Sequence, residues 1–119
     1  MKKIILFLLL CLPLEGAEVK KWIVTAYCSC EKCCSPKYAD GITASGRKVK
    51  YGMVACNWLP FGTKLLIEGY GIFTVEDRGS RKHFGTRKEK RKRIDLYLPS
   101  HREALKFGRK KLYVIILGK

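Results

Sequence analysis

The chain has 119 residues, 47% of them hydrophobic, which excludes wholesale disorder and indicates a single domain. Lysine and arginine number 25 against 10 aspartates and glutamates, so the formal net charge is +15 at pH 7. Such an excess indicates an anionic partner or a solubility device, and it carries no information about the fold.

The N-terminal segment has the features of an export signal. Two lysines precede the apolar run of residues 4–12, and a Gly-Ala pair that suits cleavage follows it. The apolar run is too short to span a bilayer comfortably. We therefore expect residues 1–17 to be a signal peptide and residues 18–119 to form an exported domain of the periplasm, outer membrane or cell wall. Cleavage of a lipoprotein before Cys11 is the alternative.

Six short segments are rich in β-branched and aromatic residues and are bounded by glycine or proline, which predicts strands. They cover residues 22–27, 51–56, 64–68, 72–77, 94–98 and 112–117. One short helix is expected after Ser100, because Ser100 and Glu103 form a capping box and Gly108 provides a left-handed stop. Short strands with glycine-rich turns favour a small closed barrel. The predicted fold class is therefore mainly β, a six-stranded barrel with one short helix as a lid.

Two aspartates, Asp77 and Asp95, lie within otherwise apolar strands. A carboxylate among apolar residues is costly unless it is paired, hydrogen-bonded or used in chemistry. Two such acids on consecutive strands indicate a site more than a solvated face. Asp77 shares its strand face with Phe73 and Val75, which normally point inward, so we expect it to be the more buried acid. The alternative for Asp77 is a structural acid that accepts hydrogen bonds from loop amides.

Seven short motifs follow one another along the chain from about Val24 to Leu117. They are Thr25-Ala26-Tyr27, Thr43-Ala44-Ser45-Gly46, Pro60-Phe61-Gly62-Thr63, Gly69-Tyr70-Gly71, Glu76-Asp77, Arg93-Ile94-Asp95-Leu96-Tyr97, and Glu103-Ala104 with Phe107-Gly108. In this order they resemble the 3D domain, a family named for three aspartates. The chain also resembles the catalytic barrel of membrane-bound lytic transglycosylase A.

The resemblance implies a double-psi β-barrel that cleaves peptidoglycan glycan strands. It puts Asp95 at the position taken to be the family's catalytic acid, and Asp77 in the second aspartate motif. The first family aspartate follows a Val-Ala pair and one further residue, where this chain has Asn57. One of the three acids is therefore missing. The link between Asp77 and Asp95 is also longer and more basic than the family's usual glycine-rich link.

A lytic transglycosylase can work with one carboxyl group, because the 6-hydroxyl of muramic acid attacks its own anomeric carbon and forms a 1,6-anhydro ring. Asp95 would protonate the leaving oxygen and a base would take the hydroxyl proton, a role that Asp95 could fill in turn, and no cofactor is expected. For this role the pKa of Asp95 must be raised by apolar neighbours or by a second carboxylate. The expected function is an exported lytic transglycosylase that cleaves the MurNAc–GlcNAc bond. The alternative is a non-catalytic cell-wall glycan-binding module.

Four further residues are candidates for contacts with the glycan. Thr43, Ser45 and Gly46 would line the cleft and hydrogen-bond sugar hydroxyls, and Tyr97 would stack on a sugar face. The alternatives are a tight turn of small residues for the first three and simple packing for the strand tyrosine.

Removal of the signal peptide would leave five cysteines, at positions 28, 30, 33, 34 and 56. In an oxidising compartment the favoured interpretation is disulfides, with the first four joined internally and one of them tied to Cys56. The alternative is a zinc site formed by Cys28, Cys30, Cys33 and Cys56. The sequence contains one Cys-x-x-Cys spacing and no second pair at zinc-finger spacing.

The segment from Arg78 to Arg93 contains nine lysines or arginines and one acid, Glu89. It has no apolar periodicity, which predicts a long turn or hairpin arm. In an exported protein such a segment favours attraction to an anionic cell envelope over nucleic acid, and a solvated arm is the alternative. We expect no nucleic-acid partner and a monomeric chain. The two histidines, His83 and His101, are expected to be solvated.

Overall fold

The computed structural model describes residues 20–30 and 40–119, so the predicted signal peptide lies outside the described residues. The described part of the chain forms six strands and two short helices. In chain order they are β1 (Lys20–Tyr27), β2 (Met53–Ala55), β3 (Lys64–Ile67), β4 (Gly71–Asp77), α1 (Arg81–Phe84), β5 (Arg93–Tyr97), α2 (His101–Phe107) and β6 (Lys110–Gly118). Neither helix in these ranges has the length and apolar character needed to cross a lipid bilayer.

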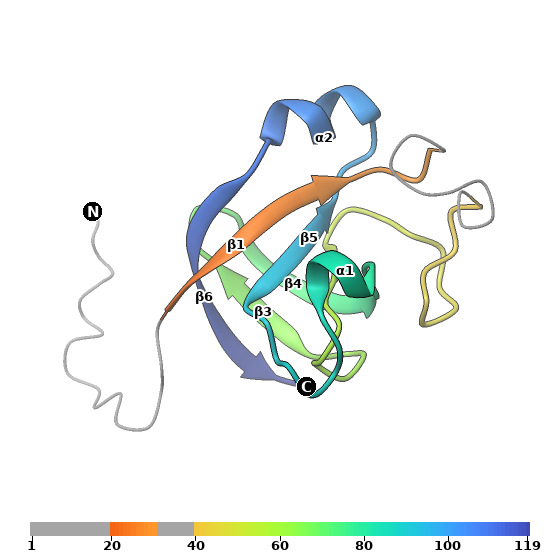
Figure 1. Ribbon diagram of the computed structural model, residues 1–119. Coiled ribbons are helices and arrows are strands. Elements are labelled where there is room, and N and C mark those ends of the chain that lie inside the picture. Colours follow the sequence, from red (N-terminus) through yellow and green to blue (C-terminus); the bar gives the residue numbers. More distant parts are fainter. Residues whose placement is uncertain (1–19, 31–39) are drawn as a thin grey trace.

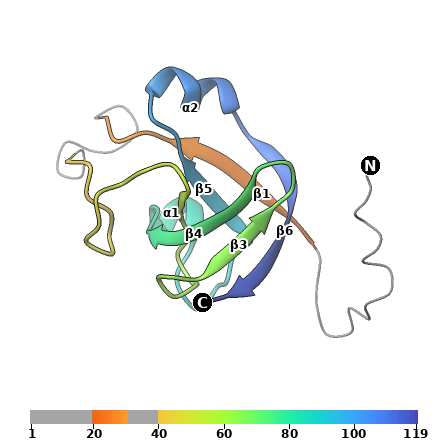
Figure 2. The ribbon, with the colours of Figure 1, turned by 180° about the vertical axis from the view of Figure 1, so that it is seen from behind.

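The strands close into one mixed barrel (Figure 1). Their order around the barrel is β1-β5-β2-β4-β3-β6. β1 runs parallel to β5 and β2 parallel to β4, whereas the other neighbours are antiparallel. Exchanging β1, β2 and β3 for β4, β5 and β6 leaves this order and these directions unchanged. The barrel therefore consists of two interlocked three-stranded halves, the double-psi arrangement, and the predicted fold class is confirmed. The β3–β4 hairpin closes it on the side seen in Figure 2.

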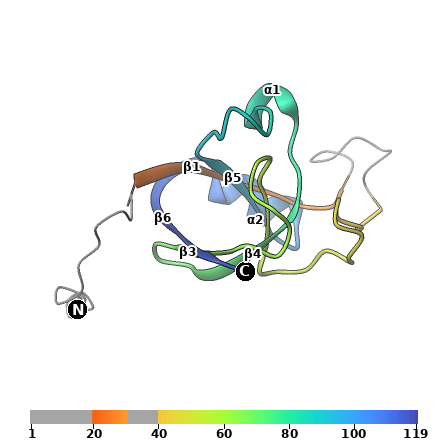
Figure 3. The same ribbon diagram turned by 90° about the horizontal axis from the view of Figure 1, so that it is seen from below.

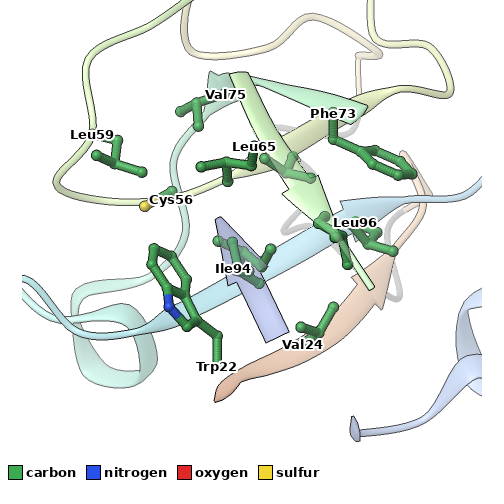
Figure 4. Close-up of a cluster of buried hydrophobic side chains, with 12 residues drawn as sticks. Trp22, Val24, Cys56, Leu59, Leu65, Phe73, Val75, Ile94 and Leu96 are labelled. Carbon is green, nitrogen blue, oxygen red and sulfur yellow. The ribbon is translucent and has the colours of Figure 1, made fainter. Parts of the chain in front are cut away.

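The barrel interior is filled by apolar side chains that alternate along the strands. Val24 of β1, Phe73 and Val75 of β4, and Ile94 and Leu96 of β5 are each at most 1% exposed and belong to one cluster (Figure 4). Since successive strand residues point to opposite faces, the inward direction of Ile94 and Leu96 sends the residues between and beside them to the outer face. The hydrophobic pattern of β5 thus decides where Asp95 points.

α2 covers the end of the barrel where β1 and β5 end, and it packs on β1 (Figure 1). The Ser100 hydroxyl accepts from Glu103 N at 3.1 Å, and Gly108 follows the helix with a φ of 71°, as the sequence predicted. Beyond the ends of the two strands, Leu98 N donates to Tyr27 O at 2.8 Å. The helix is therefore held against the ends of β1 and β5, and β5 is the strand that contains Asp95.

The segment from Arg78 to Arg93 is not a plain turn or hairpin arm, because it contains the second helix, α1, which stands outside the barrel (Figure 3). Phe84 of α1 is buried against Gly79, where an added Cβ would lie 2.3 Å from the ring. The Arg78 guanidinium turns inward and donates to Cys56 O at 2.7 Å. A helix of four residues has too few turns to show periodicity, which explains why one helix was predicted instead of two.

Candidate active site

Asp77 and Asp95 lie on the two strands that flank β2. Ala55 of β2 is paired with Asp95 of the antiparallel strand β5 and with Asp77 of the parallel strand β4. Neighbouring strands lie about 4.8 Å apart, so the α-carbons of the two acids are separated by about 10 Å across Ala55. The structure therefore brings the two predicted acids to one place.

A β-bulge sets the direction of Asp77. Val54 pairs with Val75, but the next residue of β2, Ala55, pairs with Asp77, so Glu76 is an extra residue in β4. One extra residue reverses the alternation of side chains beyond it. Asp77 consequently lies with Ala55 on the outer face, and the predicted inward orientation beside Val75 is wrong.

The carboxylate of Asp77 is held by three hydrogen bonds. Its Oδ2 accepts from the Tyr27 hydroxyl at 2.7 Å, and its Oδ1 accepts from the backbone N–H groups of Ala44 and Arg78, each at 2.9 Å. Two of these donors are loop amides, as the structural alternative for this residue predicted. Asp77 therefore connects β1, β4 and the loop that contains Ala44.

Asp95 is held at one oxygen. Its Oδ1 accepts from the Thr25 hydroxyl at 2.9 Å, and its Oδ2 accepts no hydrogen bond within residues 20–30 and 40–119. Burial raises the pKa of Asp95 from the ordinary value of 3.8 to about 6, although the Thr25 hydrogen bond and the charge of Arg93 act in the opposite direction. The negative charge of Asp77 adds a smaller rise to this pKa. Both acids are half-buried, so the structure does not distinguish Asp77 as the more buried acid that we expected.

Two tyrosines pack beside the acids. The rings of Tyr27 and Tyr97 meet edge to face with centroids 5.7 Å apart, and both contact Ala55 in a small cluster covered by Val49. Tyr97 is only 9% exposed, so its ring has little free surface for stacking on a sugar. This position fits the alternative that Tyr97 is a packing residue. The two rings also help to bury the acids.

Thr43, Ser45 and Gly46 form a tight turn next to Asp77. The Thr43 and Ser45 hydroxyl oxygens lie 2.8 Å apart, Gly46 N donates to Thr43 O at 2.9 Å, and Gly46 has a φ of 89°. Ser45 N also donates to Glu76 O at 3.1 Å, which anchors the turn to the bulge. These contacts fit the alternative of a turn of small residues, and a role in binding sugar stays a prediction.

Asn57, where the resemblance implied an aspartate, is a buried amide that hydrogen-bonds the backbone. Its Nδ2 donates to Gly79 O at 3.0 Å and to Gly85 O at 2.8 Å, and its Oδ1 accepts from Gly79 N at 2.7 Å. An ionised aspartate has no N–H group with which to make the first two bonds. The side chain therefore holds the segment around α1 in a way that requires an amide.

The position of Cys56 differs from both predictions. Cys56 is a free thiol at 0% exposure in the main core, where burial raises its pKa, so neither the disulfide to Cys56 nor a zinc site that includes it is present. The sulfurs of Cys28 and Cys30 both lie beside His101. The prediction of a solvated His101 is therefore wrong. Cys33 and Cys34 lie outside the described residues.

His83 is exposed, as predicted, and its Nδ1 lies 3.1 Å from the Ser80 hydroxyl.

A surface cavity of about 470 Å³ lies near the bulge and is lined by Glu76 but by neither aspartate. Its other lining residues are Arg47, Lys50, Tyr51, Gly52, Met53, Gly62, Lys64 and Thr74. Three basic residues against one acid give this depression a net positive charge, and it is separate from the acid pair.

No protein-family profile and no curated protein matches the chain. The fold and the site define a class, a small double-psi barrel with two acids on the outer face of the two strands that flank β2. The sequence reasoning missed Thr25 and Tyr27 as partners of the acids. Their spacing of two residues on β1 was the available signal, because it puts both hydroxyls on one strand face.

The hydrogen bonds of the Asn57 amide predict the effect of introducing an acid at this position. Asn57→Asp at pH 7 removes two donated hydrogen bonds and directs a carboxylate at two carbonyl oxygens, so the free energy of unfolding should fall by about 2–5 kcal/mol. The loss should shrink at pH 3, where a protonated carboxyl can donate one bond. Urea denaturation at both pH values measures this. An Asn57→Asp variant as stable as wild type at pH 7 would show that the amide is dispensable.

The raised pKa of Asp95 predicts a pH-dependent stability. A group with a folded-state pKa of about 6 and an ordinary value of 3.8 stabilises the fold below pH 4, and that contribution is lost as the pH rises through 6. The full difference corresponds to about 3 kcal/mol as an upper estimate. The stability of Asp95→Asn relative to wild type should therefore increase by about 1–3 kcal/mol between pH 4 and pH 8.

The matched variant is Asp77→Asn, which replaces a carboxylate held by three hydrogen bonds and should lower the free energy of unfolding at pH 7 by about 1.5–3 kcal/mol. Denaturant titrations of both variants across the pH range make the comparison. Equal responses of the two variants would contradict the different roles assigned to the two acids.

Proposed function

We propose that this protein is an exported peptidoglycan lytic transglycosylase that cleaves the MurNAc–GlcNAc bond and leaves 1,6-anhydro-muramic ends. One observation carries the proposal. Asp95 has a pKa of about 6, one oxygen fixed by Thr25, and a second oxygen that accepts no hydrogen bond from the described residues. A carboxyl group with these properties is suited to give and to take a proton near neutral pH.

The proposed reaction uses Asp95 twice. In the first step the protonated Asp95 gives its proton to the glycosidic oxygen, the bond from C1 of muramic acid to that oxygen breaks, and positive charge develops at C1. In the second step the 6-hydroxyl oxygen of the same sugar bonds to C1 while the Asp95 carboxylate takes the hydroxyl proton. No water is consumed, and the enzyme returns to its starting protonation state. A pKa near the working pH allows both steps.

Thr25 and Asp77 would support Asp95 without touching the reacting bond. The Thr25 hydroxyl fixes one carboxyl oxygen and so leaves the other in a defined direction. Asp77 contributes negative charge that raises the pKa of Asp95 and, through the hydroxyl of Tyr27, links β4 to β1. Asp77 is thus assigned a positioning and electrostatic role, in place of the catalytic role that the motifs implied.

The positive surface around α1 would bring the enzyme to its substrate. Arg78 is turned inward and Arg91 is paired with Glu89 at 2.9 Å. The net positive charge of this surface comes from the other exposed basic residues of the segment. These are Arg81, Lys82, Arg87, Lys88 and Lys90. An ordered basic surface attracts an anionic cell envelope over a distance set by the ionic strength.

The decisive measurement is digestion of purified sacculi followed by identification of the released muropeptides. Wild type should release anhydro-muropeptides, with a rate that falls as the pH rises above about 6, because the acid form of Asp95 is then depleted. Asp95→Asn should lower the rate by about 10²–10⁴-fold.

Asp40→Asn is the control, since Asp40 is an exposed aspartate of a loop, and it should cleave at the wild-type rate. Full activity of a correctly folded Asp95→Asn variant would refute the catalytic assignment. Binding of wild type to sacculi without any anhydro product would instead identify a glycan-binding module.

A further inference from the structure

Three potential metal ligands converge at the end of the barrel that α2 covers. The Sγ atoms of Cys28 and Cys30 lie 2.9 Å apart, and His101 Nδ1 lies 3.7 Å from the first sulfur and 3.5 Å from the second. Cys28 is buried, and the other two side chains are half-buried. The three ligand atoms lie within 4.8 Å of one another, although His101 is more than 70 positions from either cysteine in the sequence.

From this geometry we infer that Cys28, Cys30 and His101 are ligands of a zinc ion. For zinc bonds of about 2.3 Å to sulfur and 2.0 Å to nitrogen, a tetrahedral ion holds sulfur and nitrogen about 3.6 Å apart and two sulfurs about 3.8 Å apart. Both sulfur–nitrogen distances already match this value. The two sulfurs, at 2.9 Å, need to separate by about 0.9 Å when the ion enters.

A disulfide between the same two cysteines explains less of the geometry. The sulfur–sulfur distance of 2.9 Å is well beyond the bond length of about 2.05 Å. A disulfide has no use for an imidazole nitrogen near both of its sulfurs, whereas thiolate and imidazole together form a common donor set for zinc. Three protein ligands suffice to hold the ion and leave one position for a further donor.

The fold supplies these ligands from two elements that it already holds together. Cys28 directly follows β1, and His101 is the first residue of α2, which packs on β1. A zinc ion would therefore fasten the chain that leaves β1 to the start of α2. Cys28 also follows Tyr27, whose hydroxyl donates to Asp77, so the ion would stiffen one support of the acid pair. The inference itself does not depend on glycan cleavage.

The test is metal analysis of the full chain purified under reducing conditions from cells grown with zinc. We expect about one zinc ion per chain. Replacement by Co²⁺ should give the visible absorption of a tetrahedral site with thiolate charge-transfer bands. Cys28→Ser and Cys30→Ser should each weaken those bands, and His101→Gln should lower the zinc affinity by at least about 10-fold.

Two matched controls use the same residue types outside the cluster. Cys56→Ala removes the core thiol and His83→Gln removes the exposed imidazole, and both variants should keep wild-type zinc content. His101→Gln changes a half-buried side chain at a helix start, so it tests the site even where a cysteine variant fails to fold. Wild type without zinc, wild-type affinity in His101→Gln, or a Cys28–Cys30 disulfide found by peptide mapping would each overturn the inference. None of these readouts requires activity, so they are independent of the proposed reaction.

Discussion

The extra residue in β4 opposite Val54 and Ala55 determines what the rest of the site can do. Without this bulge, Asp77 would continue the inward alternation of Phe73 and Val75 and would place a carboxylate in the barrel interior. Burial of an unpaired carboxylate there would cost far more than the stability of a small domain permits. With the bulge, the acid lies on the outer face, where Tyr27 and two backbone amides satisfy it. Asp77 also fixes the turn that contains Ala44, because it accepts a hydrogen bond from the backbone N–H of Ala44.

The two acids differ because their hydrogen bonds differ. Asp77 accepts three hydrogen bonds, so its oxygens are committed to the structure. Asp95 accepts one from Thr25, and the cost of burial outweighs both this bond and the charge of Arg93, leaving its pKa at about 6. A protein that needed only a stable barrel would gain by replacing Asp95 with a neutral side chain. Retaining a destabilising acid beside a well-satisfied one is the pattern expected of functional sites.

The strand pattern of the sequence was sufficient to predict a closed six-stranded barrel, because glycine-bounded apolar runs indicated each strand and the capping box indicated α2. It could not predict α1, a helix of only four residues that is stabilised by the packing of Phe84 on Gly79 and by the amide of Asn57, which is 28 positions from its partner Gly85. The direction of the Asp77 side chain could not be predicted from the alternation of side chains along a strand either, because a bulge leaves no signal in the hydrophobic pattern. Barrel closure alone brings Thr25 beside Asp95 and His101 beside the cysteines.

The same limitation explains why the cysteines were misinterpreted. Counting cysteines along the chain treated Cys28, Cys30 and Cys56 as equivalent thiols, but alternation on β2 sends Val54 and Cys56 into the core. The first two lie beyond the end of β1, where α2 arrives with an imidazole. A histidine nitrogen within 3.7 Å of two sulfurs adds a nitrogen donor to the two sulfur donors, and the inferred zinc site rests on this donor set. Tyr27 directly precedes Cys28 and donates its hydroxyl hydrogen to Asp77, so the cysteine cluster and the acid pair share β1 as a common support.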